Sequence, residues 1–167
     1  MCIRDSYNTA REGIVISRMV WDALLYRDPA TNEYLPNLAT SYNWVDSKTL
    51  EFDLRKGVTF HNGEKFDADD VVYTLTYISN PENGAKPARN VNWWDSAEKL
   101  GDYKVRLNLT KEFPAALEFL SGPIVMYPNE YYAEVGPEGM AMKPVGTGPY
   151  AVTSVEPGKR YKFKKND

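Results

Sequence analysis

Apolar and polar side chains alternate over three parts of the chain, a period of two that is typical of strands with one buried face. They are residues 41–60, a β-hairpin that turns at Asp46–Lys48; residues 103–109; and residues 150–163, a second hairpin that turns at Pro157 and Gly158. In the first hairpin the alternation continues past Gly57 to Val58 and Phe60, so the second strand is expected to run that far. The apolar run 124–126 predicts a short buried strand.

Helical spacing of apolar residues predicts helices at residues 11–25 and 67–80, and Pro114 and Pro128 are expected to open two shorter helices, at residues 114–120 and 129–135. The second has the clearest start, because Asp67 is a good N-cap and Asp70 stands at the third helical position, where it completes a variant of the capping box. Phe66 and Val71 fit a hydrophobic staple across that start. Loops rich in glycine, proline and asparagine are expected at residues 80–92 and 136–149.

These elements do not follow a regular strand–helix–strand rhythm. Short helices mixed with hairpins favour an α+β fold with mostly antiparallel strands. The 167 residues correspond to roughly one domain.

Composition excludes several classes of protein. The net charge of −3 is unfavourable for a general nucleic-acid binder, and the longest apolar runs are far too short to insert into a membrane. One cysteine excludes an internal disulfide and a cysteine-rich zinc site, and one histidine excludes a multi-histidine metal site. We therefore expect no metal and no cofactor.

Several local patterns suggest chemistry, but each has a simpler structural interpretation. His61 is expected to be a turn residue bonded to nearby backbone rather than a general base, since no serine has the glycine context of a nucleophile elbow. The aspartates at 67, 69 and 70 are explained by helix capping, and residues 146–149 lack the lysine of a phosphate-binding loop. The basic residues of 158–165 fit one solvated strand face better than a nucleic-acid surface. No catalytic residue is predicted.

Trp93 and Trp94 are adjacent, so in extended backbone their rings point in opposite directions. We therefore expect one ring to be exposed or to line a ligand cleft, although packing of both rings in a core is the alternative.

Four stretches in order resemble one family, the extracellular solute-binding proteins, family 5, of ABC importers. This is the dipeptide- and oligopeptide-binding class, with nickel-binding relatives. The stretches are Val20–Asp28, Leu35–Tyr42, Leu54–Val72 and Pro144–Tyr150.

The resemblance implies that the chain is the N-terminal lobe portion of a two-lobed periplasmic-binding-protein-like fold of class II. It also implies a division of the chain. Residues 1–6 would be a foreign or truncated start without a signal peptide, 7–42 the first part of ligand-binding lobe I, 43–143 an inserted subdomain, and 144–167 the return segment into lobe I. The second lobe would be absent.

The function implied is that of a non-enzymatic, substrate-binding component of an ABC importer. It would capture a peptide or a related small solute in the periplasm or at the cell surface and deliver it to the membrane permease. Sugar, nickel and opine ligands are alternatives within the family. The expected ligand-binding residues are Trp21, Asp22, Ala23, Leu24, Trp93, Trp94, Gly146, Thr147 and Gly148.

Two other classes compete with this interpretation. One is a fragment of a secreted hydrolase, which the absence of an elbow motif disfavours. The other is a carbohydrate-binding module, suggested by the 12 Tyr and 4 Trp residues.

Overall fold

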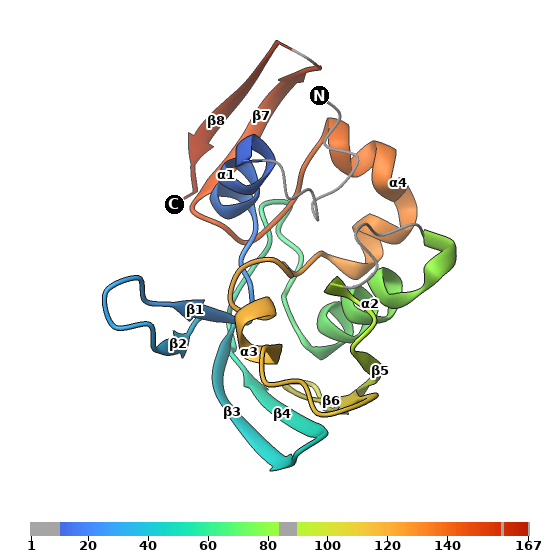
Figure 1. The fold of residues 1–167 in the computed structure, drawn as a ribbon. Helices are drawn as coiled ribbons and strands as arrows, with labels where there is room; N and C mark the ends of the chain where they lie inside the picture. The colour runs from blue at the N-terminus through green and yellow to red at the C-terminus, as the bar shows by residue number, and fades with distance from the viewer. Residues whose placement is uncertain (1–10, 84–89, 158, 167) are drawn as a thin grey trace.

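The computed structural model describes residues 11–83, 90–157 and 159–166, and in these ranges it shows helices mixed with three antiparallel sheets (Figure 1). The helices are α1 (Arg11–Val20), α2 (Ala68–Ser79), α3 (Ala116–Phe119) and α4 (Asn129–Met142), with a 3₁₀ turn at Pro81–Asn83. The strands are β1 (Leu25–Arg27), β2 (Tyr34–Pro36), β3 (Ala39–Asp46), β4 (Thr49–Leu54), β5 (Trp94–Gly101), β6 (Lys104–Leu109), β7 (Tyr150–Glu156) and β8 (Arg160–Lys165).

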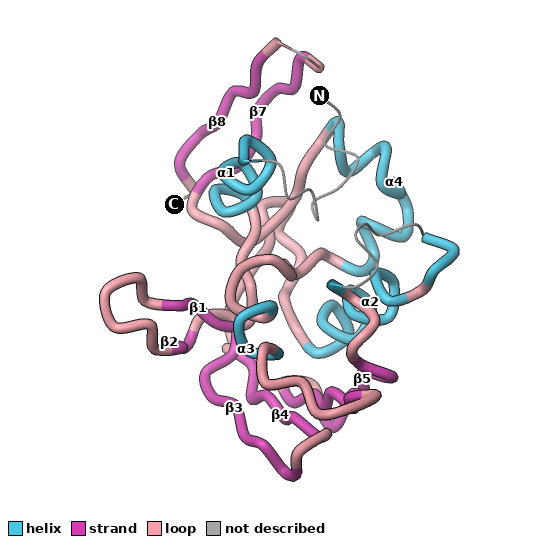
Figure 2. Tube along the Cα trace, viewed as in Figure 1, coloured by secondary structure: helices cyan, strands magenta, loops and turns pink. Residues whose placement is uncertain are grey.

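The largest sheet has four strands in the order β3–β4–β6–β5, all antiparallel. Leu50, Phe52 and Leu54 on β4 point to the same side as Val105 and Leu107 on β6, and all five are buried. Helix α2 lies against β5 and β6, and α4 lies beside α2 (Figure 2). Alternation in β4 and β6 thus produces the core, as the sequence pattern predicts.

The start of α2 forms as expected. The carboxylate of Asp67 accepts the Asp69 N–H at 2.8 Å, and the carboxylate of Asp70 accepts the Asp67 N–H at 2.9 Å, which completes a capping box. Phe66 and Val71 are both fully buried, consistent with the staple. Asp70 also accepts the Asn129 N–H at 2.8 Å and so joins the starts of α2 and α4. Burial raises the pKa of the Asp70 carboxyl to about 6.

The first helix is shorter than predicted. It ends at Val20, and the expected helical residues Ala23 and Leu24 lie in a non-helical stretch between two other segments. The carbonyl of Leu24 accepts the Ala39 N–H at 2.8 Å, and the carbonyl of Asp22 accepts the Met126 N–H at 3.0 Å. A non-helical segment that is buried on both sides has apolar residues next to one another in the sequence. Such a run cannot be told from the buried face of a helix by its spacing alone.

Three other boundaries differ from the predictions. Strand β4 ends at Leu54 rather than near Phe60, because Gly57 takes a left-handed φ of 79° and Phe60 closes a local turn with Glu64. Residues 124–126 are buried but form only an isolated bridge between Val125 and Ala23, not a strand. Helix α4 continues to Met142 with a kink at Gly136, so the predicted loop is shorter.

The tryptophan pair corrects a further expectation. Trp93 is 2% exposed and Trp94 is 3% exposed, so neither ring is at the surface. Trp93 stacks on Phe113 with ring centroids 4.8 Å apart, whereas the Trp94 indole N–H donates to the carbonyl of Leu75 at 3.3 Å. Only Trp94 belongs to a strand, and a register irregularity follows it, so both rings turn into the core and touch edge to face.

The remaining predictions of this kind have mixed outcomes. The final hairpin is present as β7 and β8, but the tip residue Gly158 lies outside the described residues. The loop after Asn80 begins as expected with the 3₁₀ turn, and residues 84–89 lie outside the described ranges. Helix α3 covers the middle of the predicted 114–120 segment.

Candidate functional site

A pocket of about 680 Å³ lies where α1 ends and the chain enters β1. Three of the predicted ligand-binding residues, Trp21, Asp22 and Ala23, line it. The rest of its wall comes from α1, from β1 and β2 with their connecting turn and the residue after β2, from α3 and the segment after it, and from the residue before β7. These residues are Arg18, Leu25, Tyr26, Arg27, Pro29, Asn32, Leu35, Pro36, Asn37, Glu118, Ser121, Gly122, Pro123, Val125 and Pro149.

Trp21 forms part of the pocket wall but is almost entirely covered, with 2% of its surface exposed. Its indole N–H donates to the carbonyl of Val145 at 2.7 Å, and its ring meets Tyr127 edge to face at 5.9 Å. A buried indole with its one donor satisfied is a rigid anchor. Trp21 therefore fixes the loop that begins at Val145 against the end of α1.

Asp22 connects the pocket to the same loop. Its carboxylate accepts the hydroxyl hydrogen of Thr147 at 2.9 Å across 125 residues of sequence. Both residues are among the ligand-binding residues expected from the sequence, and in the structure they are in direct contact.

Gly146 and Gly148 allow this contact because they press against the backbone of Val20. A Cβ on Gly146 would lie 2.1 Å from the Val20 carbonyl oxygen, and a Cβ on Gly148 would lie 2.7 Å from the Val20 carbonyl carbon. The Gly148 N–H donates to the Val20 carbonyl at 2.9 Å. The two glycines are thus required for close approach of two backbones.

His61 also takes part in this arrangement, a contact that was not predicted from the sequence. Its ring does bond to backbone, as expected of a turn residue, but the backbone is that of the distant 146–148 loop. Nε2 lies 2.8 Å from the Gly148 carbonyl oxygen, and the Gly146 N–H points to Nδ1 at 3.3 Å. The His61 N–H also donates to the Gly146 carbonyl at 2.9 Å.

Not all predicted residues meet at the pocket. Leu24 is fully buried and does not line it, and Trp93 and Trp94 lie in the core of the sheet region rather than in its wall. Gly146, Thr147 and Gly148 stand behind the wall and support it through Trp21 and Asp22.

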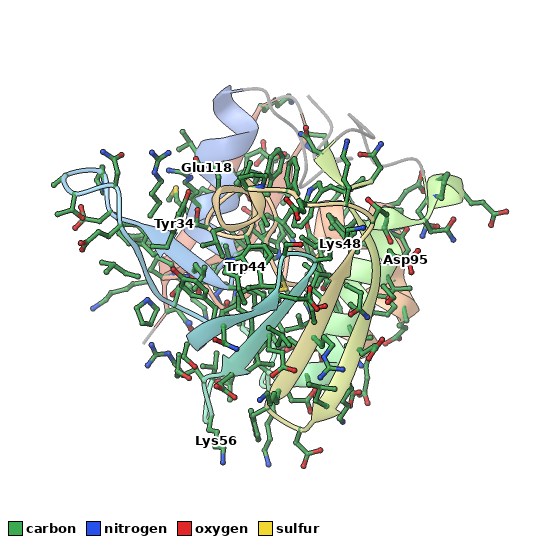
Figure 3. All side chains as sticks on the ribbon, turned by 60° about the horizontal axis from the view of Figure 1, so that its bottom comes forward. Tyr34, Trp44, Lys48, Lys56, Asp95 and Glu118 are labelled. Carbon is green, nitrogen blue, oxygen red and sulfur yellow. The ribbon has the colours of Figure 1, made fainter. Side chains whose placement is uncertain are left out.

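A charged cluster at one end of the pocket was not predicted. The Arg27 guanidinium pairs with the Glu118 carboxylate at 2.7 Å, and its other nitrogen donates to the Asn32 side-chain oxygen at 3.0 Å. The Tyr34 hydroxyl donates to the same Glu118 carboxylate at 3.1 Å, and both side chains are labelled in Figure 3. Burial and, secondarily, this hydrogen bond raise the pKa of Tyr34. No local sequence signal marks these residues, because their partners come from separate elements.

The pocket wall combines apolar side chains such as Leu25 and Leu35 with polar ones such as Arg18 and Asn32. In the described ranges, no group of three or more His, Cys, Asp or Glu side chains is placed to hold a metal ion. The His61 ring is occupied by backbone partners on both nitrogens. Within the same ranges, none of the helices has the length and apolar character needed to cross a membrane.

Comparison with known proteins identifies relatives of this fold. A family model described as "Bacterial extracellular solute-binding proteins, family 5 Middle" matches residues 33–167. The Di/tripeptide-binding protein 1 of Pseudomonas aeruginosa is 28% identical over 183 aligned residues, which cover 96% of this chain and 34% of the relative. The chain therefore spans about a third of the length of such relatives.

Solved structures agree with the sequence relatives. The chain is similar to NikZ from Campylobacter jejuni in complex with Ni(L-His), with 31% identity, a TM-score of 0.81, and coverage of 90% of this chain and 31% of NikZ. It is also similar to the ABC transporter-associated periplasmic binding protein DppA from Helicobacter pylori in complex with the peptide STSA. There the identity is 25%, the TM-score 0.85, and the coverage 99% of this chain and 37% of DppA. The two-lobed architecture of these neighbours matches the fold class predicted from the sequence.

Proposed function

The chain belongs to the bacterial extracellular solute-binding proteins of family 5, and on this basis we propose that it is part of the substrate-binding component of an ABC importer. The single observation that carries the proposal is the family match over residues 33–167, supported by the likeness to peptide-bound DppA over nearly the whole chain. The protein would capture its solute outside the cytoplasmic membrane and deliver it to a membrane permease without chemical change.

A peptide is the ligand that the relatives favour. The Pseudomonas relative is named for di- and tripeptides, and the Helicobacter structure contains a tetrapeptide. Peptides present donors, acceptors and apolar side chains together, and a wall that mixes Arg18 and Asn32 with Tyr26 and Leu35 meets these needs. The nickel complex of NikZ makes a small metal complex the second candidate ligand.

We propose that the chain is divided between two structural parts of the binding protein. Residues 7–42 and 144–167 would form part of lobe I, and residues 43–143 would be the inserted subdomain. The contacts of Trp21 and Asp22 with the 145–148 loop support this assignment, because they tie the first segment to the last one. In this proposal Trp21, Asp22 and Ala23 form the wall, and Gly146, Thr147 and Gly148 support it.

The experiment that tests the function uses the full-length parent protein, purified without denaturation from cells grown on rich medium. Mass spectrometry of the small molecules released on unfolding is expected to find peptides of two to five residues. An Asp22→Ala parent is the matched comparison and is expected to retain less peptide. Release of a sugar or a nickel complex in place of peptides would contradict the peptide assignment.

A further inference from the structure

His61 occupies an unusual place in the connectivity of the fold. It belongs to the turn after β4, within the proposed inserted subdomain, yet its ring and its backbone bond to a loop 85 residues later. That loop carries Thr147, which holds the Asp22 carboxylate in the pocket wall. His61 is therefore bonded directly to the 146–148 loop and is linked to Asp22 only through Thr147 of that loop.

The partners of the ring define its chemical state. A backbone N–H can only donate, so Nδ1 must accept from Gly146 and carry no hydrogen. A carbonyl oxygen can only accept, so Nε2 must donate to Gly148. Both requirements hold only for the neutral imidazole with its hydrogen on Nε2.

The bonds of His61 add to the other bonds that hold this loop, which are those of Trp21 to Val145 and of Gly148 to Val20. Gly146 and Gly148 contribute no side chains, and both are pressed against Val20. The Gly148 carbonyl accepts from His61 and, at 3.3 Å, from the Asn166 side chain. The bonds of His61 thus act on both glycines that flank Thr147.

We propose that His61 is a positioning residue for the binding lobe. Its neutral, Nε2-protonated ring fixes the 146–148 loop and, through Thr147, the orientation of the Asp22 carboxylate. His61 itself does not touch the ligand. The proposal rests on the proposed function only in naming the lobe that the loop serves.

The first test needs no ligand and uses the 167-residue chain in NMR experiments at pH 8. The His61 ring nitrogens are expected to show the Nε2–H tautomer. In a His61→Phe variant, which keeps a ring but loses both bonds, hydrogen exchange of the Gly148 amide is expected to be about tenfold faster. The indole N–H signal of Trp21 is expected to shift in the same variant, because its acceptor Val145 precedes the loop.

The matched control is Asn62→Ala, which removes the side-chain bond of the neighbouring residue to the Glu64 N–H but no bond to the loop. Its Gly148 exchange is expected to match that of the unchanged chain. Equal Gly148 exchange in His61→Phe and Asn62→Ala would overturn the proposal. If His61→Phe does not fold, the tautomer measured in the unchanged chain tests the proposal. A His61 ring with its hydrogen on Nδ1 would then overturn it.

The second test measures binding of the tetrapeptide Ser-Thr-Ser-Ala, and of a pool of di- to pentapeptides, to the full-length parent by calorimetry. His61→Phe is expected to weaken peptide binding about tenfold, while Asn62→Ala leaves it unchanged. Equal affinity in both variants would overturn the positioning role. A parent that binds no peptide would contradict the proposed function and not the loop contacts, which the NMR experiments decide separately.

Discussion

Replacement of Gly146 by alanine should lower the free energy of unfolding by more than the addition of a single methyl group would suggest. The new Cβ would lie 2.1 Å from the Val20 carbonyl oxygen and 2.6 Å from Cδ1 of Trp21. Because one neighbour is backbone, the loop itself must move. Three hydrogen bonds would then weaken: Trp21 to Val145, Gly148 to Val20, and Thr147 to Asp22. At about 1 kcal/mol for each bond, the expected loss is about 3 kcal/mol, and overpacking adds about 1–3 kcal/mol.

The assay is urea unfolding of the 167-residue chain, followed by tryptophan fluorescence and by circular dichroism. Gly101→Ala is the matched control, because a Cβ there meets nothing within 4 Å. Its free energy of unfolding should lie within about 0.5 kcal/mol of the unchanged chain. A Gly146→Ala chain as stable as Gly101→Ala would refute the claim that the two backbones are in close contact.

Three further predictions concern single residues and use the same unfolding assay. Asp67→Ala should cost about 1 kcal/mol through loss of the N-cap, while Asp67→Ser restores most of it; a neutral Asp67→Ala would remove Asp67 as the cap. Burial raises the Asp70 pKa to about 6, so the folded state binds this proton more tightly than the unfolded state. The stability that the protonated Asp70 contributes is therefore present below pH 4 and is lost as the pH rises through 6. The stability of the unchanged chain relative to Asp70→Asn should therefore fall by up to about 3 kcal/mol between pH 4 and pH 7, and a constant difference would contradict this assignment. Trp94→Ala should cost about 3–5 kcal/mol because the ring is buried, and an unaltered unfolding curve would show that it is not part of the core.

Local patterns were sufficient for much of the fold. Alternation predicted β4 and β6, because each of these strands buries one face, and it predicted the final hairpin, in which Val152, Tyr161 and Phe163 are half-buried. The capping residues predicted the start of α2, since a cap acts within four residues of sequence. Strand β5 was missed because it is an edge strand with mostly exposed side chains after Trp94, so no apolar alternation marks it.

The candidate site was only partly predictable for a related reason. Asp22 and Thr147 were identified as candidates, but their contact spans 125 residues and has no local signature. The bonds of His61 to the 146–148 loop could not be predicted from the sequence, because a histidine at this position is equally well explained by the turn in which it lies. The exposure expected for Trp93 or Trp94 was wrong because the rule of opposite directions holds within a regular strand, and Trp93 precedes β5.

The central claim is that this chain supplies one part of a two-lobed, peptide-binding protein, and parallel calorimetry tests it most directly. A pool of di- to pentapeptides is titrated into the full-length parent and into the 167-residue chain. The parent should bind at about micromolar affinity, or about −8 kcal/mol, because a closed site of this kind encloses about 70–90% of the ligand surface. The chain alone should bind no tighter than about millimolar, because about half of the contacts are missing. Micromolar binding by the monomeric 167-residue chain, or no binding by the parent, would contradict the account.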